Sequence, residues 1–173
     1  MKHRKKKKAL LVFLAIIAAG FVIPEDIKIP VEGASQNDWN KDSFWYEPWG
    51  KSGVHKGIDI FAAKGTKLFS SSNGLVLYSG TLARGGKVVV VLGPKWRVHY
   101  YAHLDSIHTD MLSLVTPDTL IGTVGDTGNA KTTPPHLHYS IVTLIPNPFR
   151  IDSSTQGWKK MLYLDPGKLL LEP

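Results

Sequence analysis

Short runs of β-prone residues, each closed by turn residues, constrain the fold of this chain most. The runs occupy 66–70, 75–79, 88–92, 96–104, 120–124 and 136–144. Turn dipeptides stand between them, such as Asn73-Gly74, whose residues both accept the positive φ that a tight hairpin needs. No sustained helical periodicity interrupts them before residue 154. The pattern therefore predicts an all-β fold, an antiparallel β-sandwich or barrel.

The positive charge of the chain sits almost entirely at its start. The formal net charge is +7, but six of the 21 basic residues lie within the first eight positions. The remaining 15 face 14 acidic residues, which leaves +1 for everything after residue 8. An apolar run, 9–23, follows the basic cluster at once. A nucleic-acid-binding arm would not continue in this way, so we expect no nucleic-acid partner.

Residues 1–23 have the organisation of an export signal, with a basic start that stays on the cytoplasmic side. The apolar run has 15 residues, whereas a membrane-spanning helix needs about 17 to 25. A signal peptide is therefore favoured, and Ala18-Ala19-Gly20 offer small residues for cleavage. Because Phe21 to Ile23 extend the run past them, an uncleaved membrane tether through residues 9–23 is the alternative. In both cases the domain is expected to be exported, to the periplasm or cell envelope.

The length of 173 residues suits one domain with its own core. Residues 24–53 are rich in Asp, Asn, Ser, Gly and Pro, which predicts irregular structure. They include four aromatic residues, Phe44, Trp45, Tyr46 and Trp49. We expect these to pin the segment onto the core, and the alternative is that they wall a groove. The C-terminal extension, 146–173, is expected to cover an edge of the core.

The chain has no cysteine, which excludes disulfides, thiolate metal sites and cysteine nucleophiles. Any metal must therefore be bound by histidine and carboxylate. Four of the seven histidines fall in three compact segments, 55–59, 100–104 and 135–139, and the first of these also carries Asp59. A single histidine is more often a surface or packed residue than a ligand, but three such segments together predict a metal site.

Strand geometry predicts which of these side chains face the same way. Side chains alternate along a strand, so His136 and His138 point to one side with Cα atoms about 6.6 Å apart. By the same parity, His103 shares a face with Tyr101 and His99.

His55 and Asp59 need a different explanation. On a straight strand they would stand about 13 Å apart, which is too far for two ligands of one ion. The chain must therefore bend between them, and we expect the bend at Gly57, which has no Cβ to forbid an unusual φ.

Taken together, the three segments resemble the lysostaphin-type zinc metalloendopeptidases, also called LytM-like peptidoglycan peptidases. The matching motifs are His55-x-x-x-Asp59, Tyr101-Ala102-His103-Leu104 and His136-Leu137-His138, supported by Gly65-Thr66, Gly74-x-Val76, Gly122 and Gly125-x-x-Gly128. The resemblance covers roughly residues 54–145, and three ordered motifs are far more specific than any one of them. The sequence departs from the family pattern in the turn 116–119, where a glycine is expected, which touches no chemistry.

The resemblance implies a zinc peptidase core over 54–145, a duplicated β-barrel-like motif of the hybrid type with a loop-lined groove. It implies that His55, Asp59 and His138 bind Zn²⁺ and that His103 and His136 are catalytic. Three protein ligands leave the fourth position of a catalytic zinc for water. The expected function is therefore hydrolysis of peptide bonds in peptidoglycan, at its cross-links or bridges.

Two other interpretations stay open. One is a non-catalytic domain of the same fold that regulates a cell-wall hydrolase, although such domains usually lose metal ligands and all five positions are present here. The other is a membrane-tethered protein with a structural metal, which needs a closed site of four protein ligands. Neither His99 nor His108 matches a ligand position. We expect His108 to be exposed, and a place for His99 beside the site is the less favoured alternative.

Overall fold

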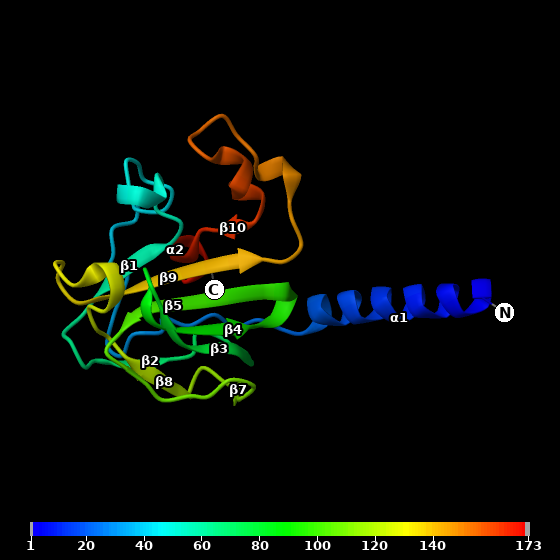
Figure 1. Ribbon diagram of the computed structural model, residues 1–173, viewed down its shortest axis with the longest axis horizontal. Coiled ribbons are helices and arrows are strands. Elements are labelled where there is room, and N and C mark those ends of the chain that lie inside the picture. Colours follow the sequence, from blue (N-terminus) through cyan, green and yellow to red (C-terminus); the bar gives the residue numbers. More distant parts are fainter. Residues whose placement is uncertain (1, 172–173) are drawn as a thin grey trace.

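The computed structural model describes residues 2–171, which form two antiparallel sheets (Figure 1). The larger sheet has the strand order β1 (Ile58–Phe61), β9 (His136–Thr143), β5 (Arg97–Leu104), β4 (Gly86–Leu92), β3 (Gly74–Leu82) and β7 (Leu114–Val115), and β10 (Tyr163–Leu164) also pairs with β9. The smaller sheet has the order β2 (Lys67–Phe69), β8 (Leu120–Thr123) and β6 (Ser106–Ile107). The prediction of an all-β antiparallel fold is confirmed.

Helical structure is confined to the ends of the chain and to short turns. The helices are α1 (Lys2–Val22) and α2 (Pro166–Leu169), and the 3₁₀ turns are η1 (Gly50–Ser52), η2 (Pro94–Trp96), η3 (Gly128–Ala130), η4 (Pro148–Arg150) and η5 (Gly157–Met161). The apolar run 9–23 lies almost wholly in α1, which projects away from the sheets (Figure 1). Within residues 2–171, no helix combines the length and the apolar character that crossing a membrane requires.

Each of the six predicted β-prone runs contains a strand. The strands that the pattern did not predict are β1, β6, β7 and β10, which have two to four residues each. Alternation cannot be recognised over so few positions. These strands form because a longer neighbour is available to pair with, as β9 is for both β1 and β10.

The core lies between the two sheets, and β9 shows how it positions the functional side of the molecule. On one face of β9 the residues are apolar and fully buried: Leu137, Tyr139 and Ile141. They pack with apolar residues of the small sheet and of β1, including Leu68, Ile121 and Ile60. Because side chains alternate, the opposite face of the same strand carries His136 and His138.

The segment 24–53 is irregular and packs against the domain along its length. Trp45 is buried and meets Tyr163 edge-on, while Phe44 packs against the core. Trp49 instead stacks on a histidine ring, 4.1 Å from the centroid of His55. The aromatic residues therefore divide between the two expected roles, since some pin the segment to the core and Trp49 walls a groove.

Candidate metal centre and groove

The pairing of β1 with β9 brings the first two candidate ligands together. Asp59 and His138 are directly opposite each other in the register, and Phe61 is opposite His136. Residues opposed in this way have Cβ atoms about 4.5–5.5 Å apart. Two segments 79 residues apart in sequence thus present their polar side chains at one point.

His55 reaches the same point because the chain before β1 lies very close to β9. Gly57 does not take a positive φ, but a Cβ built on it would meet the carbonyl oxygen of Tyr139 and lie 2.6 Å from Ser140 Oγ. Glycine is required here by close approach of two backbones, and not by an unusual φ as expected from the sequence. The carbonyl oxygen of Ser43 then fixes the His55 ring, by accepting a hydrogen bond from Nδ1 at 3.0 Å.

The His103 side chain, in segment 100–104, reaches the same groove in a way that strand alternation did not predict. Tyr101 is fully buried in the core, yet Ala102 and His103 both line the groove. The register between β4 and β5 shifts here, so that Val88 of β4 lies opposite both Ala102 and His103 of β5, and His103 has φ +67°. This is a β-bulge, which turns a side chain out of the strict alternation. The prediction that His103 shares a face with Tyr101 and His99 is therefore wrong.

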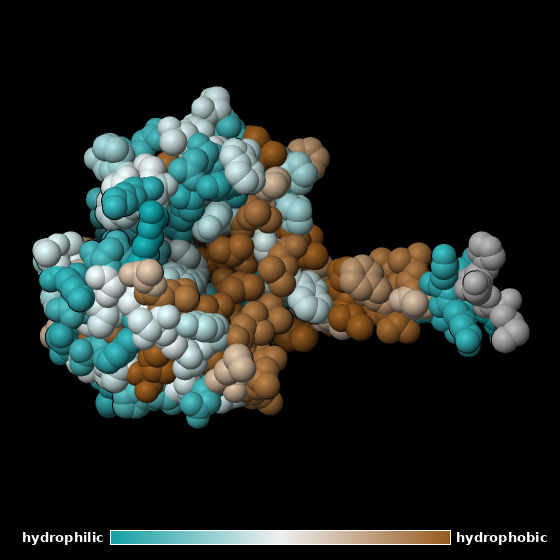
Figure 2. All heavy atoms as spheres, in the orientation of Figure 1, coloured by the Kyte–Doolittle hydropathy of each residue, from teal (hydrophilic) through white to brown (hydrophobic). Residues whose placement is uncertain are grey.

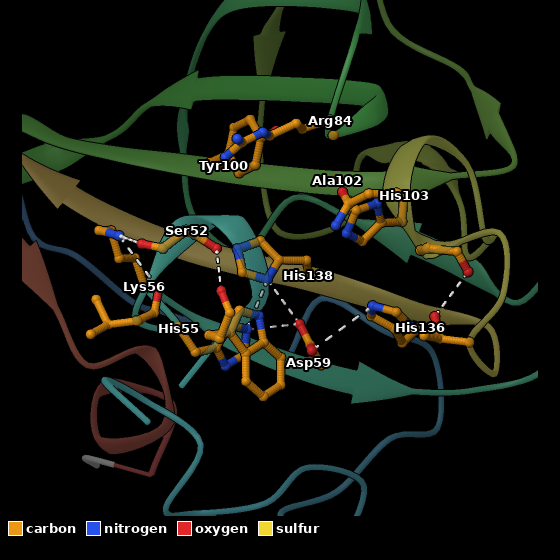
Figure 3. A pocket seen from close by; sticks show the side chains of 16 residues that line it. Ser52, His55, Lys56, Asp59, Arg84, Tyr100, Ala102, His103, His136 and His138 are labelled. Carbon is orange, nitrogen blue, oxygen red and sulfur yellow. Dashed lines mark hydrogen bonds and ion pairs between the residues drawn. The ribbon is translucent and has the colours of Figure 1, made fainter. Parts of the chain in front are cut away.

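The three predicted ligands form a compact group of donor atoms (Figure 3). Asp59 Oδ1 lies 2.8 Å from His138 Nδ1 and 3.1 Å from His55 Nε2. The two ring nitrogens are themselves 3.1 Å apart. Ligand atoms bound to one tetrahedral zinc at about 2.0–2.2 Å stand roughly 3.3 Å from one another. The group is therefore close to the size that one zinc ion requires.

Hydrogen bonds on the far side of each ring direct a lone pair toward this point. With its Nδ1–H donated to Ser43, His55 presents Nε2 unprotonated. His138 Nε2–H donates to Ser140 Oγ at 3.2 Å, since the Ser140 hydroxyl is itself donated to the carbonyl of Lys56. His138 is thus left with an acceptor Nδ1. Metal-binding histidines are commonly held by such outer partners.

The two predicted catalytic histidines are oriented in the same way. His103 Nδ1–H donates to the carbonyl of Thr127 at 2.9 Å, and His136 Nδ1–H donates to the carbonyl of Pro134 at 2.8 Å. Both therefore keep Nε2 free, and His136 Nε2 lies 3.9 Å from Asp59 Oδ2. Their rings are 5.1 Å apart, centroid to centroid.

The electrostatics of the group fit a cation. Two ring lone pairs and a carboxylate oxygen facing each other repel unless a positive charge lies among them. Burial raises the pKa of Asp59, but the rings of His138 and His55, which donate to the carboxylate when they carry a proton in place of a bound cation, outweigh burial and hold the pKa far below its usual range. Burial, followed by the nearby His138 and His136, lowers the pKa of His103 to about 4, so its ring is neutral at neutral pH.

All five predicted residues line one open groove of about 350 Å³. Its other walls come from residues that the list of predicted ligands and catalytic groups did not include, namely Trp49, Ser52, Val54, Lys56, Arg84, Gly85, Tyr100, Ala102, Asn129, Ala130 and Thr133. Figure 3 shows Arg84 and Tyr100 on the side of the groove opposite His55 and Asp59. The groove is open, so the group of donor atoms is accessible from solvent.

Several residues that shape the site gave no sequence signal. Ser43 and Thr127 act through backbone carbonyls, which any residue type could supply, and Ser140 acts through a single hydroxyl. His108 is exposed, as expected. His99 is fully buried on the core side of the sheet, bonded to Tyr139 and Ser72, so it does not enter the groove.

A comparison with protein families agrees with this geometry. The model of peptidase family M23 matches residues 53–148, a span that includes all five predicted site residues. The chain belongs to peptidase family M23. The resemblance to lysostaphin-type and LytM-like peptidases drawn from the three motifs is thereby confirmed.

Some curated relatives of this chain are named as peptidases and others as activators of hydrolases. The L-Ala--D-Glu endopeptidase of Bacillus subtilis (strain 168) is 32% identical over 115 residues, which cover 61% of this chain and 35% of that protein. The murein hydrolase activator NlpD of Salmonella dublin is 32% identical over 105 residues, covering 60% of this chain and 27% of that protein. The chain thus spans about a third of the length of these relatives.

Solved structures share the M23 fold. The catalytic domain of lysostaphin from Staphylococcus simulans superposes with a TM-score of 0.61 and 23% identity, over 79% of this chain and 96% of that one. This likeness establishes the architecture, a curled antiparallel sheet, and agrees with the strand order described above.

Proposed function

We propose that this chain is a zinc-dependent endopeptidase that hydrolyses peptide bonds in bacterial peptidoglycan, at cross-links or bridges. The observation that carries the proposal is the convergence of five side chains from three distant segments in one open groove. Three of them point donor atoms at a common site, and two more stand beside it with free ring nitrogens. Family membership and a relative named as an endopeptidase support the same conclusion.

The donor set fits zinc, since two imidazole nitrogens and one carboxylate oxygen are a common ligand set of catalytic zinc sites. We propose that His55, Asp59 and His138 hold the ion. Bound there, zinc would supply Lewis-acid chemistry at the scissile carbonyl. A closed structural site needs a fourth protein ligand. His103 and His136 instead face the groove, which favours catalysis over a purely structural metal.

Proton transfer falls to His103 and His136. Each keeps Nε2 as an acceptor because its Nδ1–H is held by a backbone carbonyl. Either ring can take a proton from the attacking water and return it to the leaving amine. The second ring, once protonated, can donate a hydrogen bond to the oxyanion that develops on the carbonyl. Substituting each histidine separately assigns the two roles.

A regulatory role is the second candidate. It is favoured by the similarity to a relative named as a murein hydrolase activator. Such a domain would bind the cell wall or a hydrolase through the same groove without cutting. The five complete positions and the open groove argue for turnover, and the two candidates differ in whether the chain alone releases product.

We also propose that the domain acts outside the cytoplasm, exported by residues 1–23 as a signal peptide or held at the membrane by an uncleaved tether through residues 9–23. The basic first turns of α1 and the apolar remainder support this placement. A peptidoglycan substrate requires it as well, because that polymer lies in the cell envelope.

The decisive experiment incubates the purified full-length chain, in detergent, with cross-linked peptidoglycan and identifies soluble peptides by mass spectrometry. We expect products that disappear with a zinc chelator and return when zinc is restored. An inactive chain that stimulates an added peptidoglycan hydrolase would favour the regulator.

Variants separate metal binding from catalysis. We expect His103→Ala to retain bound zinc, measured by elemental analysis, while losing about 10²–10⁴-fold in rate, the usual contribution of a general acid or base. His108→Ala, at an exposed histidine outside the groove, is the matched control and should keep full activity. Unchanged turnover in His103→Ala would remove His103 from the catalytic group.

A further inference from the structure

Helix α1 joins the domain without a linker. Its last residue is Val22, and Glu25 is already buried in the domain with 1% of its side chain exposed. The Glu25 carboxylate accepts a hydrogen bond from Arg97 Nη1 at 2.5 Å and lies 3.7 Å from Lys95 Nζ. The three residues 23 to 25 can span at most about 10–11 Å, at about 3.3–3.6 Å each. The apolar end of α1 is therefore held directly against the domain.

A contact between α1 and the first turn before β5 strengthens this junction. Trp96 Nε1 donates a hydrogen bond to the carbonyl of Ile17 at 2.9 Å. A Cβ on Gly20 would overlap the same indole ring. Both contacts place the Trp96 ring against the backbone of α1, so the helix is packed on the domain.

The surface around this junction is apolar and exposed. Two hollows flank the end of α1, one lined by Phe21, Thr143 and residues 145–150, the other by Gly20, Ile23 and Leu114. We use the name junction face for the exposed apolar side chains at these two hollows, which are Phe21, Ile23, Leu114, Ile145 and Phe149. Phe149 is 99% exposed and Leu114 82% exposed. Figure 2 shows hydrophobic atoms continuing from α1 onto the domain where the two meet.

Cationic side chains border the junction face. Lys95, Arg97 and Arg150 line the first hollow together with Phe149. Glu25 pairs with Lys95 and Arg97, while Arg150 takes part in no ion pair within residues 2–171. Long basic side chains beside exposed aromatic and aliphatic groups are typical of protein surfaces at the phosphate level of a bilayer.

We propose that the junction face lies in the headgroup region of a phospholipid bilayer, with the basic side chains at the lipid phosphates. The proposal rests on the tether part of the proposed function and is independent of catalysis. If the apolar residues of α1 are in lipid, the missing linker brings the junction face to the membrane surface. The junction face has exposed apolar side chains bordered by basic ones, which is the composition that a position in the headgroup region requires. Strand β9 then runs away from the bilayer, from Thr143 at the first hollow to His136 in the groove.

The absence of cysteine permits a direct test with single labelled positions. Four full-length variants, Phe149→Cys, Leu114→Cys, Leu82→Cys and Phe13→Cys, are labelled with a small fluorophore. Each is reconstituted in vesicles of phosphatidylglycerol and phosphatidylethanolamine. Leu82 is the matched control, because it is 42% exposed but lies at the end of β3 remote from the second hollow. Phe13 reports separately whether α1 is in lipid.

Quenching by nitroxide lipids and by aqueous iodide is then compared. We expect nitroxide lipids to quench the labels at 149 and 114 at least about twofold more than the label at 82, which iodide should quench. If the label at position 13 is in lipid while the labels at 149 and 114 are quenched like the label at 82, residues 9–23 are a tether but the junction face does not contact the bilayer. If the label at 13 also reports water, both are wrong. Protection of 149 and 114 from both quenchers would show that protein covers the face.

Discussion

At the scale of single residues, the site depends on hydrogen bonds that never touch a substrate. Each of the four groove histidines has its outer nitrogen bound by an acceptor, a backbone carbonyl in three cases and Ser140 Oγ in the fourth. These bonds fix the tautomer, and so decide which nitrogen carries the lone pair that faces the groove. Of the four acceptors, Ser140 alone acts through its side chain and can therefore be removed by mutation.

We expect Ser140→Ala to weaken zinc binding by about 10-fold, within the 10–100-fold range usual for such partners. Without the hydroxyl, His138 Nε2–H loses its acceptor, and the tautomer with Nδ1 free for metal is no longer favoured. Zinc affinity can be measured by competition with a chelating dye. Ser79→Ala is the matched control, because Ser79 also lies on a strand and donates one hydrogen bond to a backbone carbonyl, that of Thr109. Equal affinities for the two variants would contradict the proposed role of Ser140.

At the scale of elements, alternation along a strand predicted part of the site and failed at one position. His136 and His138 face the groove together because β9 is regular throughout. His103 does not follow the same rule, because a bulge at the end of β5 changes the count. A bulge depends on how two strands pair, so no pattern within residues 96–104 could reveal it. The three-motif resemblance placed His103 in the site where local geometry alone could not.

The close approach of Gly57 to β9 leads to a prediction at this scale. We expect Gly57→Ala to lower the free energy of unfolding by about 1–3 kcal/mol, the usual cost of overpacking. Its Cβ would press on the backbone of Tyr139, so β1 must move away from β9. Zinc affinity should fall too, because His55 and Asp59 lie on either side of the displaced segment.

Denaturant unfolding and zinc titration measure the two effects of Gly57→Ala. Gly33→Ala serves as the comparison, since Gly33 has φ +73° and open space around it. That change strains one residue by about 1–2 kcal/mol and should leave zinc affinity unaltered. If Gly57→Ala binds zinc as the unaltered chain does, close approach is not what holds His55 in place.

At the scale of the whole molecule, the candidate metal centre connects segments that are distant in sequence. The six longer β-prone runs and the all-β class could be foreseen from patterning, because each reflects a local period. How segment 24–53 supports His55 could not, since it depends on the carbonyl of Ser43 and the stacked ring of Trp49. Such contacts arise from the packed fold and leave no periodic trace.

Zinc should stabilise this arrangement as a whole. An ion that binds only the folded chain adds about 2.7 kcal/mol to the free energy of unfolding at 100 times its dissociation constant. We expect thermal unfolding to shift upward with added zinc and downward with a chelator. Asp59→Asn should abolish the shift, whereas His108→Ala should retain it. A shift that survives in Asp59→Asn would place the stabilising ion elsewhere.

Strand β9 also sets a working distance. His136 and Thr143 are seven residues apart, which at about 3.3 Å per residue corresponds to about 23 Å. With Thr143 at the lipid surface, hydrolysis would take place at a fixed height of a few nanometres or less, on whatever layer of the wall passes there. The distance of a peptide bond from the membrane surface, as well as its chemistry, would then decide whether it is cut. The length of β9 would set that distance.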